Sequence, residues 1–526
     1  MRLPRLRIRN LSGAAAAGLH VLLLLAVVAV PVCAIARALY VLTSADDPGQ
    51  IEDLIDVRRW LTLLGNTGIV CGVALVTATV LGLVLGFLVA RTDLPGRTTL
   101  ILAAVLGACV PVYVSVVFIF SVIPVWRFAH SAVACGLMHG LIYTPLAVIV
   151  LAAVFRSADH ELEEQARLDA GESSVVLRIT IPQAGWGIAA VGMIVVLLAT
   201  TDHSIADILI VRTFAEEVYT QFALHGSAAG PVVASIPVLV LLAVMLVAMQ
   251  VRYRLLGEHS PWQFGASLRT IPLGRWRRPV AILCFVVILA LLGPPTVSLL
   301  RRIETFERFI TTVGSVQPEL FRSALAAISG ATVVVLFAVG SAWAALRTGR
   351  LRWFICAAVV LLLAMPAPVA GISLIDLLNR PGPVGQLYDS PAAIIFGYIV
   401  RFLPFGILLL IPAVQRVPVE NEMAARVDGC NWLAVQRHVY WPAVATHAAI
   451  VWLVILILCF GEVGTTILLA PPGWSTAAVR AATLIHFGVY RDLAVLAVLS
   501  VAHILIPWLL LVYLVRRAVT GTRVSA

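Results

Sequence analysis

The chain has 526 residues, of which 61% are hydrophobic and only 12% are charged, and its mean hydropathy is +1.01. Soluble globular domains carry about a quarter charged residues, so this composition excludes an ordinary soluble protein and favours a polytopic membrane protein. The formal net charge of +10 is typical of basic loops retained on the cytoplasmic side of a membrane. We therefore expect lipid rather than nucleic acid around this chain.

The apolar stretches predict an all-α fold of about twelve transmembrane helices, since each span needs about 20 apolar residues. The short alternating segments of a transmembrane barrel are absent from the sequence. In chain order we expect spans centred near residues 28, 76, 110, 144, 193, 240, 289, 334, 365, 403, 456 and 503.

The basic residues predict how the chain is oriented. They cluster before the first span, between the sixth and seventh spans, and after the last one, and all of them are arginine. With an even number of spans these three regions lie on one side, which the positive-inside rule assigns to the cytoplasm. We expect a multi-pass protein of the bacterial inner (plasma) membrane with cytoplasmic N- and C-termini.

One polar phrase occurs twice, as ELEEQARLDAG from Glu161 and as ENEMAARVDGC from Glu420. Glu422 follows Glu163 by 259 residues, and the same offset relates three further pairs of identical residues. The dipeptide Arg-Thr also repeats, at Arg91 and at Arg347, 256 residues apart. Such a repeated order of motifs and spans indicates a parallel tandem duplication of one six-span unit.

The duplication predicts three regions. The first repeat covers residues 1–260 and contains a cytoplasmic loop at 156–182. An arginine-rich cytoplasmic linker follows at 261–278. The second repeat covers residues 279–526 and contains the equivalent loop at 416–442.

Each loop reads as a short helix, a turn and a second helix that leads into the next span. Glu163 with Arg167, and Glu422 with Arg426, have the i,i+4 spacing that supports a helix. A glycine follows each pair and permits a sharp turn or a left-handed cap. A solvated connector would explain one such loop, whereas two copies at equivalent places favour docking to a partner.

The phrase E-x-A-A-R-x-D-G followed by a proline resembles the EAA loop of ABC importer permeases. In that family the loop is the coupling helix, which fits a groove in the ATP-binding subunit. Residues 422–429 match the pattern closely. The first copy departs from it, because Gln165 replaces an alanine and the glycine stands one place later, at Gly171, after Ala170. Two fused units in one chain most resemble the ferric-iron and thiamine importers.

The resemblance implies a type I permease that binds two copies of an ABC ATPase subunit inside the cell and a solute-binding protein outside it. It also implies that these residues shape the two docking loops: Glu163, Ala166, Arg167, Asp169, Gly171, Glu422, Ala425, Arg426, Asp428 and Gly429. The expected cargo is ferric iron, with thiamine or another small solute or anion as the alternative.

ATP hydrolysis is expected in the partner, and this chain is not expected to be an enzyme. A P-loop needs a lysine to reach the nucleotide phosphates, and the sequence contains none. We expect no catalytic residue, no metal site and no cofactor bound by this chain, with ATP used by the partner subunit.

Four ionisable residues lie at or near membrane depth, where a charge is costly and marks a candidate site: Arg401, Glu462, Asp202 and His203. One hypothesis is a structural ion pair between Arg401 and Glu462. The other places them on a translocation path that favours an anion or an anion-complexed metal, with His139 and Tyr143 lining the same path. Hydrogen-bonded packing is the alternative for His139 and Tyr143.

The outer segment RTFAEEVYTQF supplies carboxylate and phenol oxygens, the hard ligands that ferric iron prefers. Glu216, Glu217 and Tyr219 are equally consistent with a docking surface for a binding protein, and no spacing here assembles a metal site.

A major-facilitator secondary transporter is the main rival, because two parallel six-span repeats also describe that class. The segment DLPGR from Asp93 is weakly similar to its signature loop. The duplicated E-A-A-R-x-D-G phrase does not belong to that family and favours the ABC permease. A non-transporting scaffold would have no need of duplicated docking loops.

Overall fold

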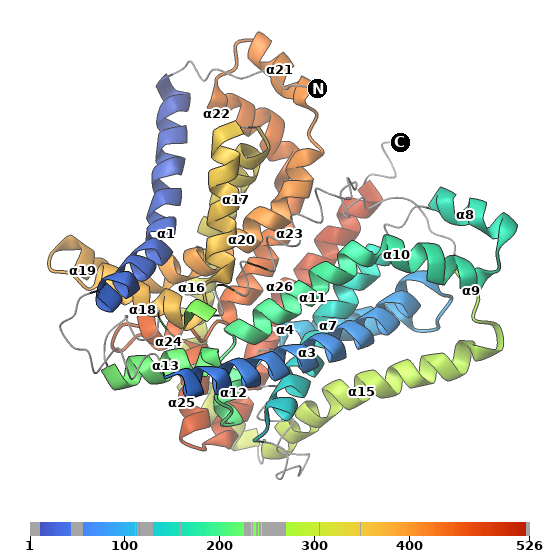
Figure 1. Ribbon diagram of the computed structural model, residues 1–526, viewed down its shortest axis with the longest axis horizontal. Coiled ribbons are helices and arrows are strands. Elements are labelled where there is room, and N and C mark those ends of the chain that lie inside the picture. Colours follow the sequence, from blue (N-terminus) through green and yellow to red (C-terminus); the bar gives the residue numbers. More distant parts are fainter. Residues whose placement is uncertain are drawn as a thin grey trace.

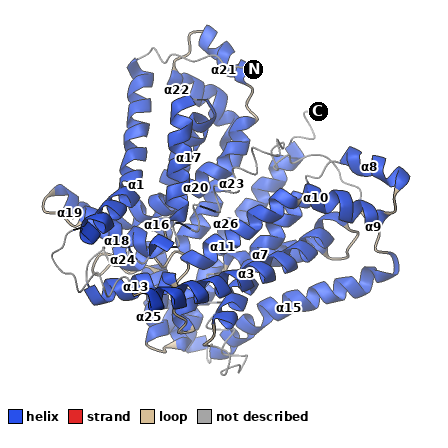
Figure 2. Ribbon diagram, in the orientation of Figure 1, coloured by secondary structure: helices blue, strands red, loops and turns tan. Residues whose placement is uncertain are grey.

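The computed structural model describes residues 11–43, 56–110, 130–156, 160–225, 270–303, 306–347 and 349–521, and the single positions 112, 115, 233, 235–237, 240 and 244. Figure 2 shows helices joined by loops, and the described residues form no strand beyond an isolated β-bridge between Thr92 and Ile271. The predicted all-α fold is confirmed. Most of the span predicted near residue 240 and most of the arginine-rich linker lie outside the described residues.

The described helices confirm a polytopic membrane protein. Seven are long and apolar enough to cross a bilayer, and two bent helix pairs raise that number to nine. The seven are α3 (Val57–Arg91), α7 (Ala132–Arg156), α15 (Arg277–Arg302), α16 (Phe306–Arg347), α20 (Ala392–Gln415), α23 (Trp441–Phe460, with the turns before it) and α26 (Tyr490–Gly521). Helices α1 (Leu11–Thr43) and α4 (Arg97–Cys109) occupy the predicted first and third spans, with shorter apolar stretches at His20–Ala36 and Arg97–Ala108. The total of twelve stays a prediction.

The span predicted near residue 365 is broken. Helix α17 (Gly349–Ala364) and helix α18 (Ala367–Leu378) meet at an angle of 108°. Pro366 stands at the break with an extended backbone, φ −61° and ψ 148°. Proline cannot donate the helical hydrogen bond and pushes the residue before it out of the helical region, so the helix ends at the preceding turn. The apolar pattern alone did not predict this interruption.

Two bundles repeat the same arrangement of core helices. In the first bundle α3 packs along α7, and α11 (Gly185–Thr201) packs on both. In the second, α16 packs along α20, and α23 packs on both. Figure 1 shows α3, α7 and α11 side by side, with α16, α20 and α23 grouped beside them. The spatial order of the helices follows the duplication seen in the sequence.

The first helix of each repeat packs partly on the other bundle. Helix α1 lies against α17, α18 and α20 of the second bundle, and its His20 Nε2 is 3.1 Å from the Ser341 hydroxyl of α16. Helix α15 packs on α4 of the first bundle as well as on α26. The repeat boundaries in the sequence therefore do not coincide with the boundaries of the packed bundles.

The contact between α3 and α7 relies on small residues. A Cβ atom added at Gly82 would lie 2.6 Å from the Cβ of Ala147, and one added at Gly140 would lie 2.6 Å from the Cβ of Thr77. Glycine on both helices thus lets the two backbones approach closely. This is a common way to associate helices in lipid, where the hydrophobic effect supplies no force between them.

We predict that Gly82→Leu destabilises the first bundle by about 1–3 kcal/mol, the usual cost of overpacking a filled interface. The matched control is Gly72→Leu on the same helix, because a Cβ at Gly72 meets nothing within 4 Å. Thermal unfolding in detergent checks both variants. Equal midpoints for the two would contradict the close helix approach.

Candidate functional site

The two repeated phrases form equivalent loops with the same sequence of elements. The first consists of α8 (His160–Asp169), α9 (Glu172–Val175) and the π-helical turn η1 (Val176–Thr180). The second consists of α21 (Val419–Val427), α22 (Trp432–Val435) and the π-helical turn η3 (Gln436–Tyr440). In Figure 1 both α8 and α21 project from the upper part of the molecule, whereas α12 (Ser204–Ile208) and α25 (Ala477–His486) lie in its lower part.

A proline follows each π-helical turn and explains it. Pro182 and Pro442 lack the N–H that would continue the i→i−4 ladder. Just before each proline, the N–H of Ile181 or Trp441 donates to the carbonyl five residues earlier. The wider turn sets the direction in which its last residue points, Thr180 in one loop and Tyr440 in the other. Such bulges are frequent at functional positions.

The first loop is anchored through the buried carboxylate of Glu163. This side chain has no exposure to solvent, and neither has the Arg91 side chain that pairs with it from the end of α3. The Thr180 hydroxyl donates to the other carboxylate oxygen at 2.7 Å. Arg91 also donates to the Phe155 carbonyl at 3.4 Å. Glu163 therefore ties α8 to α3 and to the turn that leads into α11.

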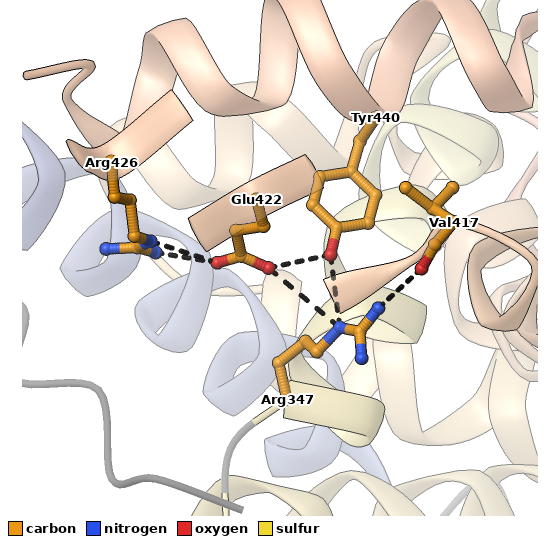
Figure 3. A network of polar contacts seen from close by, with 5 residues as sticks. All are labelled: Arg347, Val417, Glu422, Arg426 and Tyr440. Carbon is orange, nitrogen blue, oxygen red and sulfur yellow. Dashed lines mark hydrogen bonds and ion pairs between the residues drawn. The ribbon is translucent and has the colours of Figure 1, made fainter. Parts of the chain in front are cut away.

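The second loop has the same anchor with one additional partner (Figure 3). Glu422 is completely buried, and the Tyr440 hydroxyl donates to its Oε2 at 2.7 Å. Arg347, at the end of α16, lies 3.9 Å from that oxygen and donates to the Tyr440 hydroxyl at 3.1 Å. Arg426 donates to Oε1 of Glu422 at 2.8 and 3.1 Å.

The predicted i,i+4 ion pair forms in one loop only. Glu422 binds Arg426 as expected, but in the first loop Arg167 binds Glu172 at 2.7 Å and Glu163 binds Arg91. The prediction for the first loop was wrong, because the fully buried Arg91 takes Glu163 and Arg167 binds Glu172 instead. The repeated Arg-Thr dipeptide was the available signal for these partners.

The two turn glycines differ in conformation. Gly429 has a φ of +83°, a left-handed cap that lets the Cys430 N–H return to the Ala425 carbonyl at 2.9 Å. Gly171 has a φ of −69° and a ψ of 158°, which any residue adopts. Of the two predicted alternatives, the left-handed cap is therefore found at Gly429 and not at Gly171. The shift of this glycine by one place in the sequence coincides with a different turn.

The remaining loop residues face outward to different degrees. Ala166 and Ala425 are half-buried, whereas Asp169 and Asp428 are exposed at the ends of the two helices. Two apolar side chains at equivalent places are strongly exposed, Leu168 at 85% and Val427 at 86%. Each is thus an exposed apolar side chain on an otherwise polar projecting helix.

The described end of the inter-repeat linker binds directly behind the first anchor. The N–H of Ile271 donates to the Arg91 carbonyl at 2.7 Å, and the Leu273 N–H donates to Oδ1 of Asp93 at 2.9 Å. Arg277 adds a bond from Nε to the Asp93 carbonyl at 2.9 Å. The segment DLPGR thus binds the linker through Asp93.

A second group of polar residues lies where the two bundles meet. Arg401 of α20 donates to the Met365 carbonyl at 3.1 Å and to the Thr201 hydroxyl at 3.4 Å. Glu462 accepts from the Thr465 N–H at 2.9 Å. The structure does not pair Arg401 with Glu462, so the ion-pair hypothesis was wrong for the described residues.

Asp202 and His203 lie at the same junction, after the end of α11. The Tyr143 hydroxyl donates to Oδ2 of Asp202 at 3.1 Å, and the Ser204 N–H donates to Oδ1 at 2.8 Å. The His203 ring lies 4.3 Å from the Tyr219 ring, centroid to centroid.

Two more contacts join the bundles at this end. The Tyr219 hydroxyl, on α13 (Phe214–His225), donates to the Gly464 carbonyl, and Nε2 of His486 lies 3.5 Å from Oδ2 of Asp207. Glu217 pairs with Arg59 inside the first bundle.

In the part of the chain that the structure describes, no three His, Cys, Asp or Glu side chains are placed to hold a metal ion. His139 is fully buried, and its Nδ1 faces the Cys135 carbonyl at 2.8 Å.

These observations define the class of protein: a helical membrane protein with two equivalent loops, each anchored by a buried glutamate. No protein-family model matches the chain. It is 23% identical over 478 residues to the Fe(3+)-transport system permease protein FbpB 2 of Haemophilus influenzae, covering 87% of this chain and 90% of that protein.

Two shorter matches agree with this one. A putative ABC transporter permease from Caldicellulosiruptor sp. is 28% identical over 113 residues, which is 21% of this chain and 40% of that protein. The diacetylchitobiose uptake system permease protein NgcG of Streptomyces coelicolor is 27% identical over 129 residues, 24% of this chain and 43% of that protein. The chain thus resembles ABC transporter permeases, and these relatives support a place in that family and a transport role.

We predict that Glu163→Leu destabilises the chain by about 3–5 kcal/mol, because it leaves the buried guanidinium of Arg91 without a carboxylate. Adding Arg91→Met should recover most of this loss, since replacing both members of a buried pair is often nearly neutral. Equilibrium unfolding in mixed micelles measures each free energy of unfolding.

The matched control is Glu164→Leu, the exposed neighbour on the same helix, for which we expect a change within about 0.5 kcal/mol. A Glu163→Leu effect as small as that of the control, or a double variant worse than both singles combined, would contradict the anchor.

Proposed function

We propose that this chain forms both membrane halves of an ABC importer and that α8 and α21 are its coupling helices, each docking on one copy of an ATPase subunit. The observation that carries the proposal is the pair of buried carboxylates, Glu163 and Glu422, at equivalent places in the two loops. Each fastens a projecting helix to a core span on one side and to the start of the next span on the other.

Such an anchor suits the transmission of force. A helix held by a buried, hydrogen-bonded ion pair moves with the spans it is tied to, because separating the pair would leave a charge buried. Closing of two ATPase subunits on ATP would then draw α8 and α21 together. The bundles meet at the opposite end, through contacts such as His486 with Asp207, so the motion would open that end as it closes the other.

The energy for transport is proposed to come from the ATPase subunits, because the chain lacks the lysine of a P-loop. A solute-binding protein is proposed as the partner on the outer side, as the resemblance to binding-protein-dependent importers implies. The loops that would face it, near α12, α13 and α25, lie in Figure 1 away from α8 and α21.

The proposed cargo is ferric iron. Its support is the relative named as an Fe(3+)-transport permease, which matches 87% of this chain. Another relative is named for diacetylchitobiose uptake, but that match covers only 24% of this chain. Thiamine is the alternative cargo; it is a permanent cation, and like-charge repulsion from Arg401 at membrane depth opposes it as it opposes a bare ferric ion.

A secondary transporter would have no use for two anchored cytoplasmic helices with exposed apolar tips. The segment that suggested a major-facilitator signature, DLPGR, instead binds the linker through Asp93. Transport that needs ATP and survives collapse of the proton and sodium gradients would separate the two classes.

We predict that Leu168→Ser and Val427→Ser each weaken binding of the copurifying ATPase subunit about tenfold. Burying one such side chain is worth about 1.5–3 kcal/mol, and about 1.4 kcal/mol is a factor of ten in affinity. Affinity is measured on the detergent-solubilised chain with purified ATPase, and ATP-driven uptake should fall in parallel.

The control is Phe306→Ser, which removes an equally exposed apolar side chain (79%) at the far end of α16. Unchanged ATPase affinity in the double variant Leu168→Ser, Val427→Ser, with an unaltered unfolding temperature, would overturn the assignment of α8 and α21.

A further inference from the structure

Arg401 is the charged residue near the middle of the α20 span, a position where a charge is costly and usually functional. Its guanidinium reaches two neutral acceptors, the Met365 carbonyl at 3.1 Å and the Thr201 hydroxyl at 3.4 Å. Its Nε is buried with no hydrogen-bond partner. A guanidinium carries five N–H donors, so Arg401 retains unused donor capacity in a site of low dielectric.

Two other arginines with little exposure, Arg91 and Arg347, show the contrast. Arg91 pairs with Glu163, and Arg347 lies beside Glu422. Among the described residues, no carboxylate oxygen lies within 4.0 Å of a guanidinium nitrogen of Arg401. The two carboxylates expected near Arg401 bind other groups. Asp202 binds Tyr143 and Ser204, and Glu462 binds the Thr465 N–H.

Arg401 lies where an interrupted span of the second bundle meets the end of α11 of the first bundle. Met365 stands at the 108° break between α17 and α18, and Thr201 is the last residue of α11. Interrupted helices at membrane depth are where transporters hold their solutes, because exposed backbone groups are tolerated there only around a protein-lined or watery path. Arg401 thus faces the boundary between the two moving halves.

We propose that Arg401 and Thr201 form a binding site for an oxyanion, a carboxylate or phosphate group carried by the cargo. Planar guanidinium groups bind such oxyanions with paired hydrogen bonds. The Thr201 hydroxyl donates to the Leu197 carbonyl at 2.8 Å and accepts from Arg401, so it positions the guanidinium from the other bundle. The inference rests on the proposed importer function and narrows its cargo: a bare ferric ion is repelled by Arg401, whereas iron complexed by an oxyanion is attracted.

The test is equilibrium binding to the purified full-length chain in lipid nanodiscs. The probes are radiolabelled citrate, radiolabelled phosphate and ferric citrate. We expect saturable binding to the wild-type chain, at least tenfold weaker binding to Arg401→Gln, and intermediate binding to Arg401→Lys, which keeps the charge but not the planar fork. Thr201→Val, a change in the opposite bundle, should also weaken binding. Comparison of citrate with ferric citrate shows whether the site takes the free anion or the anion of a metal complex.

Arg380→Gln is the charge-matched control, because Arg380 is exposed in the turn after α18. Unfolding temperatures confirm that the variants are folded. No saturable binding to the wild-type chain, or equal binding to wild type and Arg401→Gln, would overturn the site.

The proposed function has a separate readout, uptake of labelled ferric iron by cells with and without this chain. Chain-dependent iron uptake without Arg401-dependent anion binding sinks the site and keeps the iron importer. Arg401-dependent anion binding without chain-dependent iron uptake keeps the site and sinks the iron assignment.

Discussion

A buried carboxylate in each polar loop is the constraint on which the rest of this structure depends. Removing an ionised glutamate from water costs several kcal/mol unless donors and a counter-charge surround it. Glu163 and Glu422 obtain these from places far apart in the chain: an arginine that ends a core span and a hydroxyl on a π-helical turn. Satisfying one side chain therefore fixes the positions of a projecting helix and two transmembrane helices together, in both halves of the molecule.

The duplication is close but not exact in physical terms. The second anchor spreads the charge of Glu422 over two arginines and a tyrosine, whereas the first relies on Arg91 and Thr180. In the first half the carbonyl of Arg91 also receives the linker, through Ile271. The exposed ends of the two loops are thus similar, whereas the contacts that hold the loops in place differ. Such a difference is natural in a fused chain, because its two halves are free to diverge.

Much of the fold could be predicted from the sequence, because lipid imposes long apolar helices and the repeated phrase imposes two equivalent loops. The partner of Glu163 could not, since Arg91 lies 72 residues from it and local spacing favoured Arg167 instead. The break at Pro366 was hidden inside a continuous apolar stretch. Arg401 was found from its charge alone, but its neutral partners, Thr201 and Met365, come from segments that only the packing brings together.

The central claim is that the phrase occurs twice because each copy receives one ATP-driven subunit. The most direct measurement is the subunit stoichiometry of the complex purified through a tag on this chain, determined by native mass spectrometry in detergent. The account predicts two copies of one ATP-binding subunit for each chain, with one copy lost when either Glu163 or Glu422 is replaced. A complex with a single ATP-binding subunit, or a chain that purifies with none while still transporting, would contradict it.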